Sequence, residues 1–281
     1  MTLPLRNSRL KLSQGRLFWH EMGQGPVVVF LHGSWEESSQ WIPVIEQLSQ
    51  EFHCLAPDLL GFGESEAGKV HQSIALQVEV LAEYLEALKV QSVYLVGHSL
   101  GSWVATRFAL QHPDRVQGLL ILAPEGLQLA GRSHRWRGAR FLLNPLVGAV
   151  LRSLRPLAQT FRWRRLEQLW QRRKQLLKSP TACQLLFQRR WSEVKAEALQ
   201  TQLPGLTTPV LVLQGGQDTS DASALCQRFV RLVPQAQFRR ISGVSANLLQ
   251  THPDAIADGI RQLAAGPVNL SDLVLTGEKT P

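Results

Sequence analysis

Short apolar segments of strand length, separated by helical segments, constrain the fold of this chain more than any other feature. VVVFL (27–31), VYLVG (93–97) and PVLVLQG (209–215) are almost continuously apolar, as expected of strands that are buried on both faces. The segments between them show helical spacing, as in SIALQVEVLAEYLEALKV. Strands that alternate with helices predict an α/β fold, in which helices cover both faces of a mostly parallel sheet.

One long segment interrupts this alternation. Further strands are predicted at VQGLLILAP (116–124) and FRRIS (238–242), and LKL with RLFWHEM near the N-terminus predicts a hairpin. The segment between the strands at 116–124 and 209–215 is instead rich in Arg, Leu and Trp and has helical spacing. We expect four parts, which are a first body segment 1–125, an inserted basic helical cap 126–200, a second body segment 201–265 and a flexible tail 266–281.

Positive charge is concentrated in the predicted cap. Residues 131–190 contain 15 Lys and Arg and one acid, Glu167, for a net charge of +14. The remainder contains 15 Lys and Arg against 21 Asp and Glu, a net charge of −6. Basic amphipathic helices with Trp are typical of binding to an anionic membrane surface, whereas no recognised motif supports a nucleic-acid partner. The alternative is a solvated cap whose apolar side only covers the site below it.

The cysteines and the N-terminus indicate a reducing compartment. Cys54, Cys183 and Cys226 are far apart and odd in number, which argues against a disulfide framework or a structural zinc site. MTLPLRNSRLKLSQG lacks the apolar region of a secretory signal, and no apolar run reaches the ~18 residues of a membrane span. We expect a cytoplasmic protein, peripheral on a membrane if the basic segment binds lipid, with no cofactor and no metal.

The segment GHSLG (97–101) lies between a predicted strand and a predicted helix, which is the context of a G-x-S-x-G nucleophile elbow. Gly97 and Gly101 are expected because only a very small residue fits on either side of the serine. Ser99 would be held above the sheet edge, at the positive end of the next helix, with His98 shaping the site. The alternative is a tight turn with an inert serine.

A second loop, LHGSW (31–35), follows the first buried strand. Gly33 would let the backbone turn so that the N–H of Ser34 faces the serine. Together with the N–H of Leu100, it would form an oxyanion hole. We expect His32 and Trp35 to shape this loop and not to act on the substrate.

Three motifs in this order and spacing, HGSW, DLLGFGES (58–65) and GHSLG, resemble the α/β-hydrolase superfamily. They are most similar to its HG-type branch, which has a helical cap after the sixth strand, and the resemblance covers about residues 15–265. In this reading Asp58 is structural. The resemblance implies a triad in the chain order Ser, acid, His, but it does not imply a substrate, because this fold supports many chemistries.

The resemblance places the acid after the strand that follows the cap, in a G-x-x-D loop. The segment LVLQGGQD puts Asp218 at that position. Asp221 is a weaker substitute three residues further on. Glu125, in LAPEG, stands where some relatives have their acid instead.

The resemblance also implies a Gly-His pair after the last strand, and here the sequence departs from the pattern. Counting back from Pro253 in THPD, the pair falls on Ser245 and Ala246. Ala246 therefore stands where the catalytic histidine is expected, and a methyl group replaces the imidazole.

None of the eight histidines is an obvious substitute for this base. His252 is nearest in sequence but is expected to be exposed at a helix start, and His98 lies inside the elbow on the wrong side. His134, in the basic insert, could reach in from above. The remaining candidates are expected in strands, loops or helix ends away from the site, namely His20, His53, His71 and His112.

Two functions of different classes remain open. The first is an enzyme that acts on an ester or thioester of a hydrophobic substrate, with Ser99 as nucleophile, Asp218 as acid and weak or atypical catalysis. The second is a non-catalytic hydrolase-fold protein that binds a lipid-like ligand or a protein under its cap. The retained motifs favour the enzyme, and Ala246 favours the binding protein.

Overall fold

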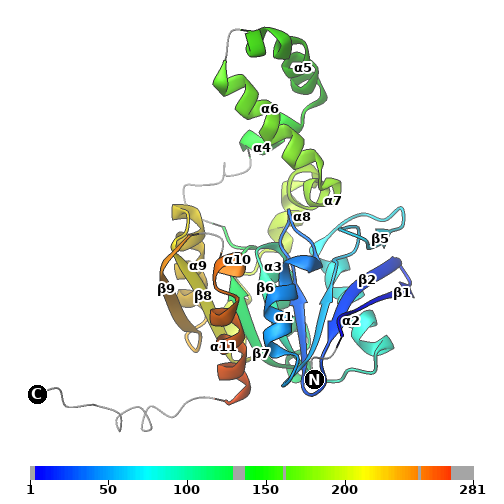
Figure 1. The fold of residues 1–281 in the computed structure, drawn as a ribbon, viewed down its shortest axis with the longest axis vertical. Helices are drawn as coiled ribbons and strands as arrows, with labels where there is room; N and C mark the ends of the chain where they lie inside the picture. Colours follow the sequence, from blue (N-terminus) through cyan, green and yellow to red (C-terminus); the bar gives the residue numbers. More distant parts are fainter. Residues whose placement is uncertain (1–3, 129–136, 161–162, 246–247, 267–281) are drawn as a thin grey trace, which may run out of the picture.

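A computed structural model of the chain describes residues 4–128, 137–160, 163–245 and 248–266 (Figure 1). Its centre is a nine-stranded sheet with the order β1-β2-β4-β3-β6-β7-β8-β9, in which β5 pairs with β2 outside this path. The strands are β1 (Arg6–Leu12), β2 (Gly15–Met22), β3 (Val27–Leu31), β4 (His53–Pro57), β5 (Glu66–Ala67), β6 (Val93–His98), β7 (Val116–Leu122), β8 (Val210–Gln217) and β9 (Gln237–Ser245).

The sheet is mostly parallel. Only the pairings of β2 with β1, β4 and β5 are antiparallel among the described strands, and the pairings from β4 through β3 to β9 are all parallel. The predicted N-terminal hairpin is thus present as β1 and β2, and the predicted α/β class with a mostly parallel sheet is confirmed.

Helices cover both faces of this sheet. Successive side chains along a strand point to opposite faces, so each central strand contributes to two cores. Val29 and Leu31 belong to the core beneath α2 (Ile74–Ala87), α3 (Leu100–Gln111) and α9 (Ser220–Leu232). Val28 and Phe30 belong to the core beneath α1 (Ile42–Leu48), α10 (Leu248–Thr251) and α11 (Pro253–Ala264). Both cores are apolar, which explains why the central strands lack a polar face.

The parallel register brings several loops to one edge of the sheet. Leu31 at the end of β3 is opposite Gly97 of β6, and Leu122 at the end of β7 is opposite both His98 of β6 and Leu213 of β8. The loops after β3, β6, β7 and β8 therefore leave the sheet at the same edge, where ligands bind in open α/β sheets.

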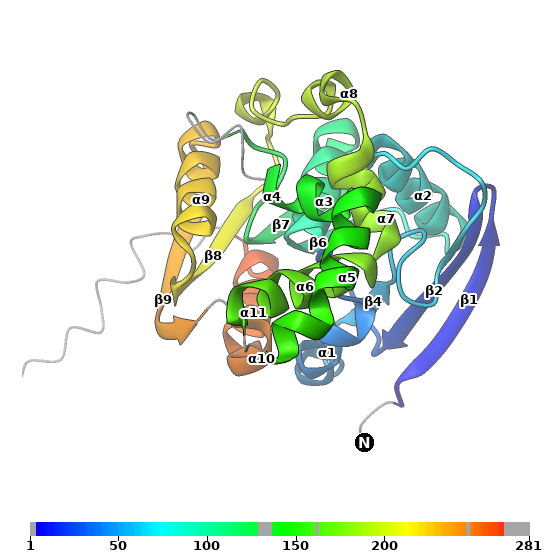
Figure 2. The same ribbon diagram turned by 90° about the horizontal axis from the view of Figure 1, so that it is seen from above.

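A group of helices lies between β7 and β8. They are α4 (Arg137–Leu143), α5 (Pro145–Thr160), α6 (Arg164–Leu177), α7 (Pro180–Cys183) and α8 (Trp191–Ala196), with a π-helical turn at Gln184–Gln188. In Figure 1, α4, α5 and α6 stand above the edge at which the parallel strands end, and Figure 2 shows them in front of that edge when it is seen from above. The cap is therefore an insertion placed over this edge of the sheet.

Short elements account for most differences from the sequence-based expectation. β5 has two residues and forms only by pairing with β2, and α10 has four, so neither has a periodic pattern of its own. The 3₁₀ turns are equally short and lie at Ser38–Trp41, Pro113–Arg115 and Leu203–Gly205. Residues 267–281 of the predicted tail lie outside the described residues.

Candidate active site

Ser99 has the backbone conformation of a sharp strand-to-helix turn. Its φ of 50° and ψ of −112° fall outside the regions that L-residues usually adopt. Within the described ranges, the other non-glycine residues with positive φ are Lys89 and Ala123. Such a conformation costs about 1–3 kcal/mol and persists only where the surroundings enforce it, which makes it typical of functional sites.

The two glycines of GHSLG are required by close packing. A Cβ at Gly97 would lie 2.5 Å from the Cα of Ser102. A Cβ at Gly101 would overlap the backbone carbonyl of Leu31, at the end of β3. Real Cβ atoms do not approach other atoms so closely, so the elbow can form only with glycine at both positions.

The loop after β7 is also bonded to the elbow. The hydroxyl of Ser102 donates to the carbonyl oxygen of Ser99, at 2.5 Å, and accepts from the N–H of Glu125, at 3.1 Å. The alternative acid Glu125 is therefore placed close to the serine. Glu125 follows β7 and Asp218 follows β8, so both candidate acids lie at the same edge of the sheet.

The proposed oxyanion-hole residues lie on two loops that are directly connected. The N–H of Gly101 donates to the carbonyl oxygen of His32, at 3.0 Å, which holds HGSW against the elbow. Ser34 and Leu100 are both buried. Leu100 is the first residue of α3, so its N–H has no partner within the helix. In the described part of the chain, neither N–H takes part in a hydrogen bond, so each can donate to a ligand oxygen.

His32 is a structural histidine, as expected. Its ring is fully buried, Nε2 accepts from the N–H of Leu59 at 2.9 Å, and Nδ1 donates to the carbonyl oxygen of Gly33 at 2.8 Å. Burial lowers the pKa of His32 below its usual value of 6.5, which keeps the ring neutral with its proton on Nδ1. Both ring nitrogens are thus used to shape the loop.

Asp58 is structural as well. It is buried, and its carboxylate accepts from the N–H of Ser38 at 2.6 Å and from the N–H of Glu64 at 2.8 Å. These bonds fasten the DLLGFGES loop to the loop that follows HGSW.

Glu36 is a site residue that the sequence analysis missed. Its Oε2 lies 2.8 Å from Nδ1 of His98. A Cβ at Gly33 would lie 2.8 Å from Oε2 of Glu36 and 2.9 Å from Nδ1 of His98, so glycine at 33 makes room for this pair. Burial would raise the pKa of Glu36, but the hydrogen bond and charge of His98 outweigh it and lower the pKa. No local motif marks Glu36, and a GSWEE segment gives no periodic signal.

Asp218 follows β8 in a tight turn. Its Oδ2 accepts from the N–H of Gly215 at 3.2 Å, and its own N–H donates to the carbonyl oxygen of Gly215 at 3.2 Å. Burial raises the pKa of Asp218, while the Gly215 N–H and the charges of His98 and Arg240 act in the opposite direction. Asp218 follows β8, whose end lies at the same sheet edge as the end of β6 and the elbow.

In the described part of the chain, no histidine forms a hydrogen bond with the hydroxyl of Ser99. Ala246 and His134 lie outside the described residues. His98 is bonded to Glu36, and no described hydrogen bond joins it to Ser99. His252 immediately precedes α11 and is half-buried, not exposed as expected.

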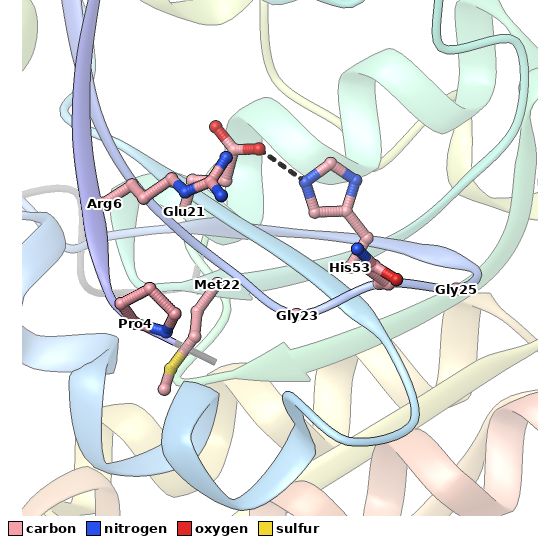
Figure 3. Close-up of a pocket in the computed structure, with 8 residues that line it drawn as sticks. Pro4, Arg6, Glu21, Met22, Gly23, Gly25 and His53 are labelled. Atoms are coloured by element: carbon pink, nitrogen blue, oxygen red, sulfur yellow. Dashed lines mark hydrogen bonds and ion pairs between the residues drawn. The ribbon is translucent and has the colours of Figure 1, made fainter. Parts of the chain in front are cut away.

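The other histidines lie elsewhere. His53 starts β4 at the opposite edge of the sheet, where it forms an ion pair with Glu21 at 2.9 Å. This pair lines a cavity of about 350 Å³, shown in Figure 3. The cavity lies at the amino ends of the parallel strands, so it is separate from the elbow. His20 pairs with Ala56 in the sheet, and His71 contacts Glu193.

Two further cavities lie between the body and the cap, and both are lined by Trp35 and Gln175. The larger, about 830 Å³, has a more polar wall than the expected apolar pocket, with Glu36, Lys178 and Gln250 among its lining residues. The smaller, about 290 Å³, is the more apolar one. Its wall consists of Trp35, Ala139, Leu176, Phe187, Arg172, Gln175 and Asp221.

Curated relatives match part of the chain in sequence. Over 122 residues, the chain is 38% identical to the pimeloyl-[acyl-carrier protein] methyl ester esterase of Vibrio vulnificus, which is 43% of this chain and 45% of that protein. Over 97 residues, it is 37% identical to a haloalkane dehalogenase of Bradyrhizobium diazoefficiens, which is 34% of this chain and 31% of that protein. The chain thus spans less than half the length of these curated relatives.

A solved structure extends the likeness to almost the whole chain. The crystal structure of a membrane phospholipase A, described as a bacterial virulence factor, matches with a TM-score of 0.70 at 19% identity. The match covers 93% of this chain and 86% of that one, which at this identity shows a common fold. The family model of the alpha/beta hydrolase fold matches residues 26–253. This match spans most of the chain, both sides of the cap included, so the chain belongs to the α/β-hydrolase fold family.

Proposed function

We propose that this protein hydrolyses an ester or thioester of a hydrophobic substrate through Ser99. In this proposal Asp218 is the acid of the site, and the N–H groups of Ser34 and Leu100 stabilise the oxyanion. The Ser99 oxygen forms a bond to the carbonyl carbon, the carbonyl oxygen becomes the oxyanion, and collapse of this intermediate expels the alcohol or thiol. Water then releases the acyl group from Ser99.

The observation that supports this proposal most is the conformation of Ser99. A residue with φ of 50° and ψ of −112° between two obligatory glycines is strained, and an inert turn has no need of that strain. The partial similarity to the Vibrio vulnificus esterase supports an ester as the substrate class, although the fold also accommodates dehalogenation.

Ala246 makes the proposed catalysis slow. Without an imidazole, the Ser99 hydroxyl has no strong base to take its proton, and an alcohol at neutral pH is a poor nucleophile. The oxyanion hole and substrate binding alone still provide about 10³–10⁴-fold acceleration over water in sites that lack a triad member. We therefore propose weak hydrolysis, with the proton passing to water or to a base in an unusual position.

The walls of the smaller cavity suggest the nature of the substrate. Trp35, Leu176 and Phe187 offer an apolar surface, while Arg172 and Asp221 carry opposite charges on the same wall. An acyl chain would suit the apolar part of this wall. This supports a hydrophobic ester as the proposed substrate.

The test is hydrolysis of short- and long-chain p-nitrophenyl esters by the wild type, Ser99→Ala and Ala246→His. The wild type should exceed Ser99→Ala, and Ala246→His should raise kcat/KM by about 10²–10⁴-fold, the usual contribution of a general base. Asn247→His is the matched control, since it adds an imidazole one position away. Equal rates for the wild type and Ser99→Ala would overturn the proposal.

A second candidate is a non-catalytic binding protein for a lipid-like ligand, and Ala246 is the observation that favours it. In that case the wild type would be no faster than Ser99→Ala, while Ala246→His would gain activity. Calorimetric binding of a long-chain fatty acid, unchanged in Ser99→Ala and weakened in Phe187→Ala, would then identify the cavity beneath the cap as a ligand site.

A further inference from the structure

The cap exposes more large apolar side chains than the body does. Of the ten exposed large hydrophobic residues in the described ranges, seven lie between residues 137 and 191. They are Phe141, Leu146, Val150, Trp163, Leu169, Leu177 and Trp191. Single exposed apolar residues need no explanation, but their concentration on one set of helices indicates an interaction surface.

The exposed residues of α5 form one stripe on the side away from α6. Leu151 is buried, and a Cβ at Gly148 would overlap the guanidinium of Arg173 on α6, so this side of α5 packs inward. Leu146 and Val150 are spaced by one helical turn and lie on the opposite side, where they are 76% and 55% exposed. The stripe therefore faces away from the helices that α5 packs against, and no described element covers it.

Exposed basic residues lie on the same group of helices. The exposed cations Arg140, Arg152, Arg164 and Arg165 form no ion pair with any described residue. The only acid within 137–190 is Glu167, and its Oε2 already forms an ion pair with Nε of Arg155, at 3.9 Å. The positive charge of α4–α6 is therefore not neutralised by the described part of the chain, and it calls for an external anion.

We propose that the outer cap face binds the surface of an anionic lipid bilayer. We define this face by Phe141, Leu146, Val150 and Trp163 with Arg140, Arg164 and Arg165. The apolar side chains would enter the boundary between headgroups and acyl chains, and the arginines would contact lipid phosphates. No described helix is long and apolar enough to cross a membrane, so the binding would be on one leaflet.

Charge and shape together favour a bilayer over other partners. A nucleic acid would need the arginines, but it gives no role to an aliphatic stripe with Leu146 at its centre. A second copy of the chain would bring two strongly basic caps together, which like-charge repulsion opposes. An anionic bilayer complements both the stripe and the charge.

The placement of the cap adds a consequence that rests on the proposed function. In Figure 1 the cap stands above the edge of the sheet from which the elbow projects. Docking through α4–α6 would bring that edge toward the bilayer, which is the source of hydrophobic esters.

The test is co-sedimentation of the full chain with phosphatidylcholine vesicles, with and without phosphatidylglycerol. We expect binding only to the vesicles that contain phosphatidylglycerol, and a blue shift of Trp fluorescence from Trp163 as it leaves water. Leu146→Ser with Val150→Ser should weaken binding about tenfold. Arg164→Glu with Arg165→Glu should also weaken it at least about tenfold, because each cation contributes about fivefold.

Matched controls come from the body. Phe238→Ser removes an apolar side chain on β9 that is 43% exposed, and Lys11→Glu with Lys69→Glu reverses two exposed charges outside the cap. These variants should bind as the wild type does. Circular dichroism and thermal unfolding of every variant establish that the fold is retained.

Several results would overturn the inference. These are equal binding to vesicles with and without phosphatidylglycerol, equal losses in the body controls, or wild-type binding after both cap changes. Binding to DNA that the apolar change leaves intact, with no binding to vesicles, would assign the face to nucleic acid. A dimer in light scattering that Leu146→Ser with Val150→Ser dissolves, again without vesicle binding, would assign it to self-association. A cap variant that no longer binds vesicles should still hydrolyse p-nitrophenyl esters in solution at the wild-type rate. The vesicle test is therefore independent of the proposed function.

Discussion

The carboxylate of Glu36 and the imidazole of His98 are joined by a hydrogen bond of 2.8 Å across 62 residues of sequence. Glu36 follows the loop that contains Ser34, and His98 precedes Ser99 in the elbow. The pair therefore fastens the two segments whose N–H groups form the proposed oxyanion hole. A change in either partner should alter the geometry of the site without touching the nucleophile.

Glu36→Gln should weaken this connection. The variant keeps the size of the side chain but removes its charge, and a charge-assisted hydrogen bond is stronger than a neutral one. Because Glu36 is 40% exposed, solvent screening limits the loss in free energy of unfolding to about 1 kcal/mol. Urea denaturation measures this loss. Glu37→Gln, at the next and exposed position, is the control, and an equal effect of both changes would contradict the assigned role of Glu36.

Replacement of Ser99 should separate strain from chemistry. Ser99→Gly releases a conformation that costs about 1–3 kcal/mol, whereas Ser99→Ala retains it. Glycine also costs about 0.5–1 kcal/mol in chain entropy, so Ser99→Gly should be more stable than Ser99→Ala by about 1 kcal/mol. Thermal unfolding of both variants tests this. Both lack the hydroxyl and should show the same background rate with esters, and a less stable Ser99→Gly would mean that the elbow is not strained.

Gly101→Ala should destabilise the protein. Its Cβ would overlap the carbonyl of Leu31, and forcing atoms into a packed site costs about 1–3 kcal/mol. Gly138→Ala is the matched control, because no atom lies within 4 Å of the added methyl and alanine favours the helix α4. Chemical denaturation should show a loss for the first variant and no loss for the second. Similar stabilities would refute the close approach of α3 to β3.

Stability should fall in mild acid because of His32. Its folded pKa is lowered by burial from the usual 6.5, so below pH 6.5 the unfolded chain takes up a proton that the folded protein excludes. The stabilising contribution of neutral His32 is complete above pH 6.5 and is lost as the pH falls to the folded pKa. Unfolding free energies measured across this range should show a slope that His32→Gln reduces.

Glutamine suits this test because its amide can still donate to the carbonyl of Gly33 and accept from the N–H of Leu59, but it does not titrate. His20→Gln, on the exposed side of β2, serves as the control for loss of a histidine. A pH slope that is the same in the wild type and in His32→Gln would show that His32 is not the responsible group.

Sequence-based prediction succeeded where the signal is local. The segment VVVFL matches β3 residue for residue, and β6 begins at the predicted Val93, because a strand buried on both faces needs an unbroken apolar run. The elbow could be predicted for the same reason, since Gly97 and Gly101 are adjacent in sequence to the serine that they accommodate. Ala246 is known from the sequence alone, as it lies outside the described residues.

The details that depend on distant contacts could not be obtained in this way. The polar wall of the larger cavity, the half-burial of His252 and the outward direction of the α5 stripe each result from the packing of separate elements. Sequence composition indicated a basic, Trp-containing cap, but it could not tell which helix faces it would leave uncovered.

By itself the sequence determined the α/β class, the order of the central strands along the chain, the serine between two glycines and the absence of a histidine at position 246. Only the tertiary structure decided that Glu36 is the partner of His98, and that Leu146 and Val150 lie on the side of α5 away from α6. The physical reason is the distance along the chain over which each interaction acts. Periodicity and steric limits act over a few residues, whereas hydrogen bonds, charges and burial depend on which loops the parallel register brings to one edge of the sheet.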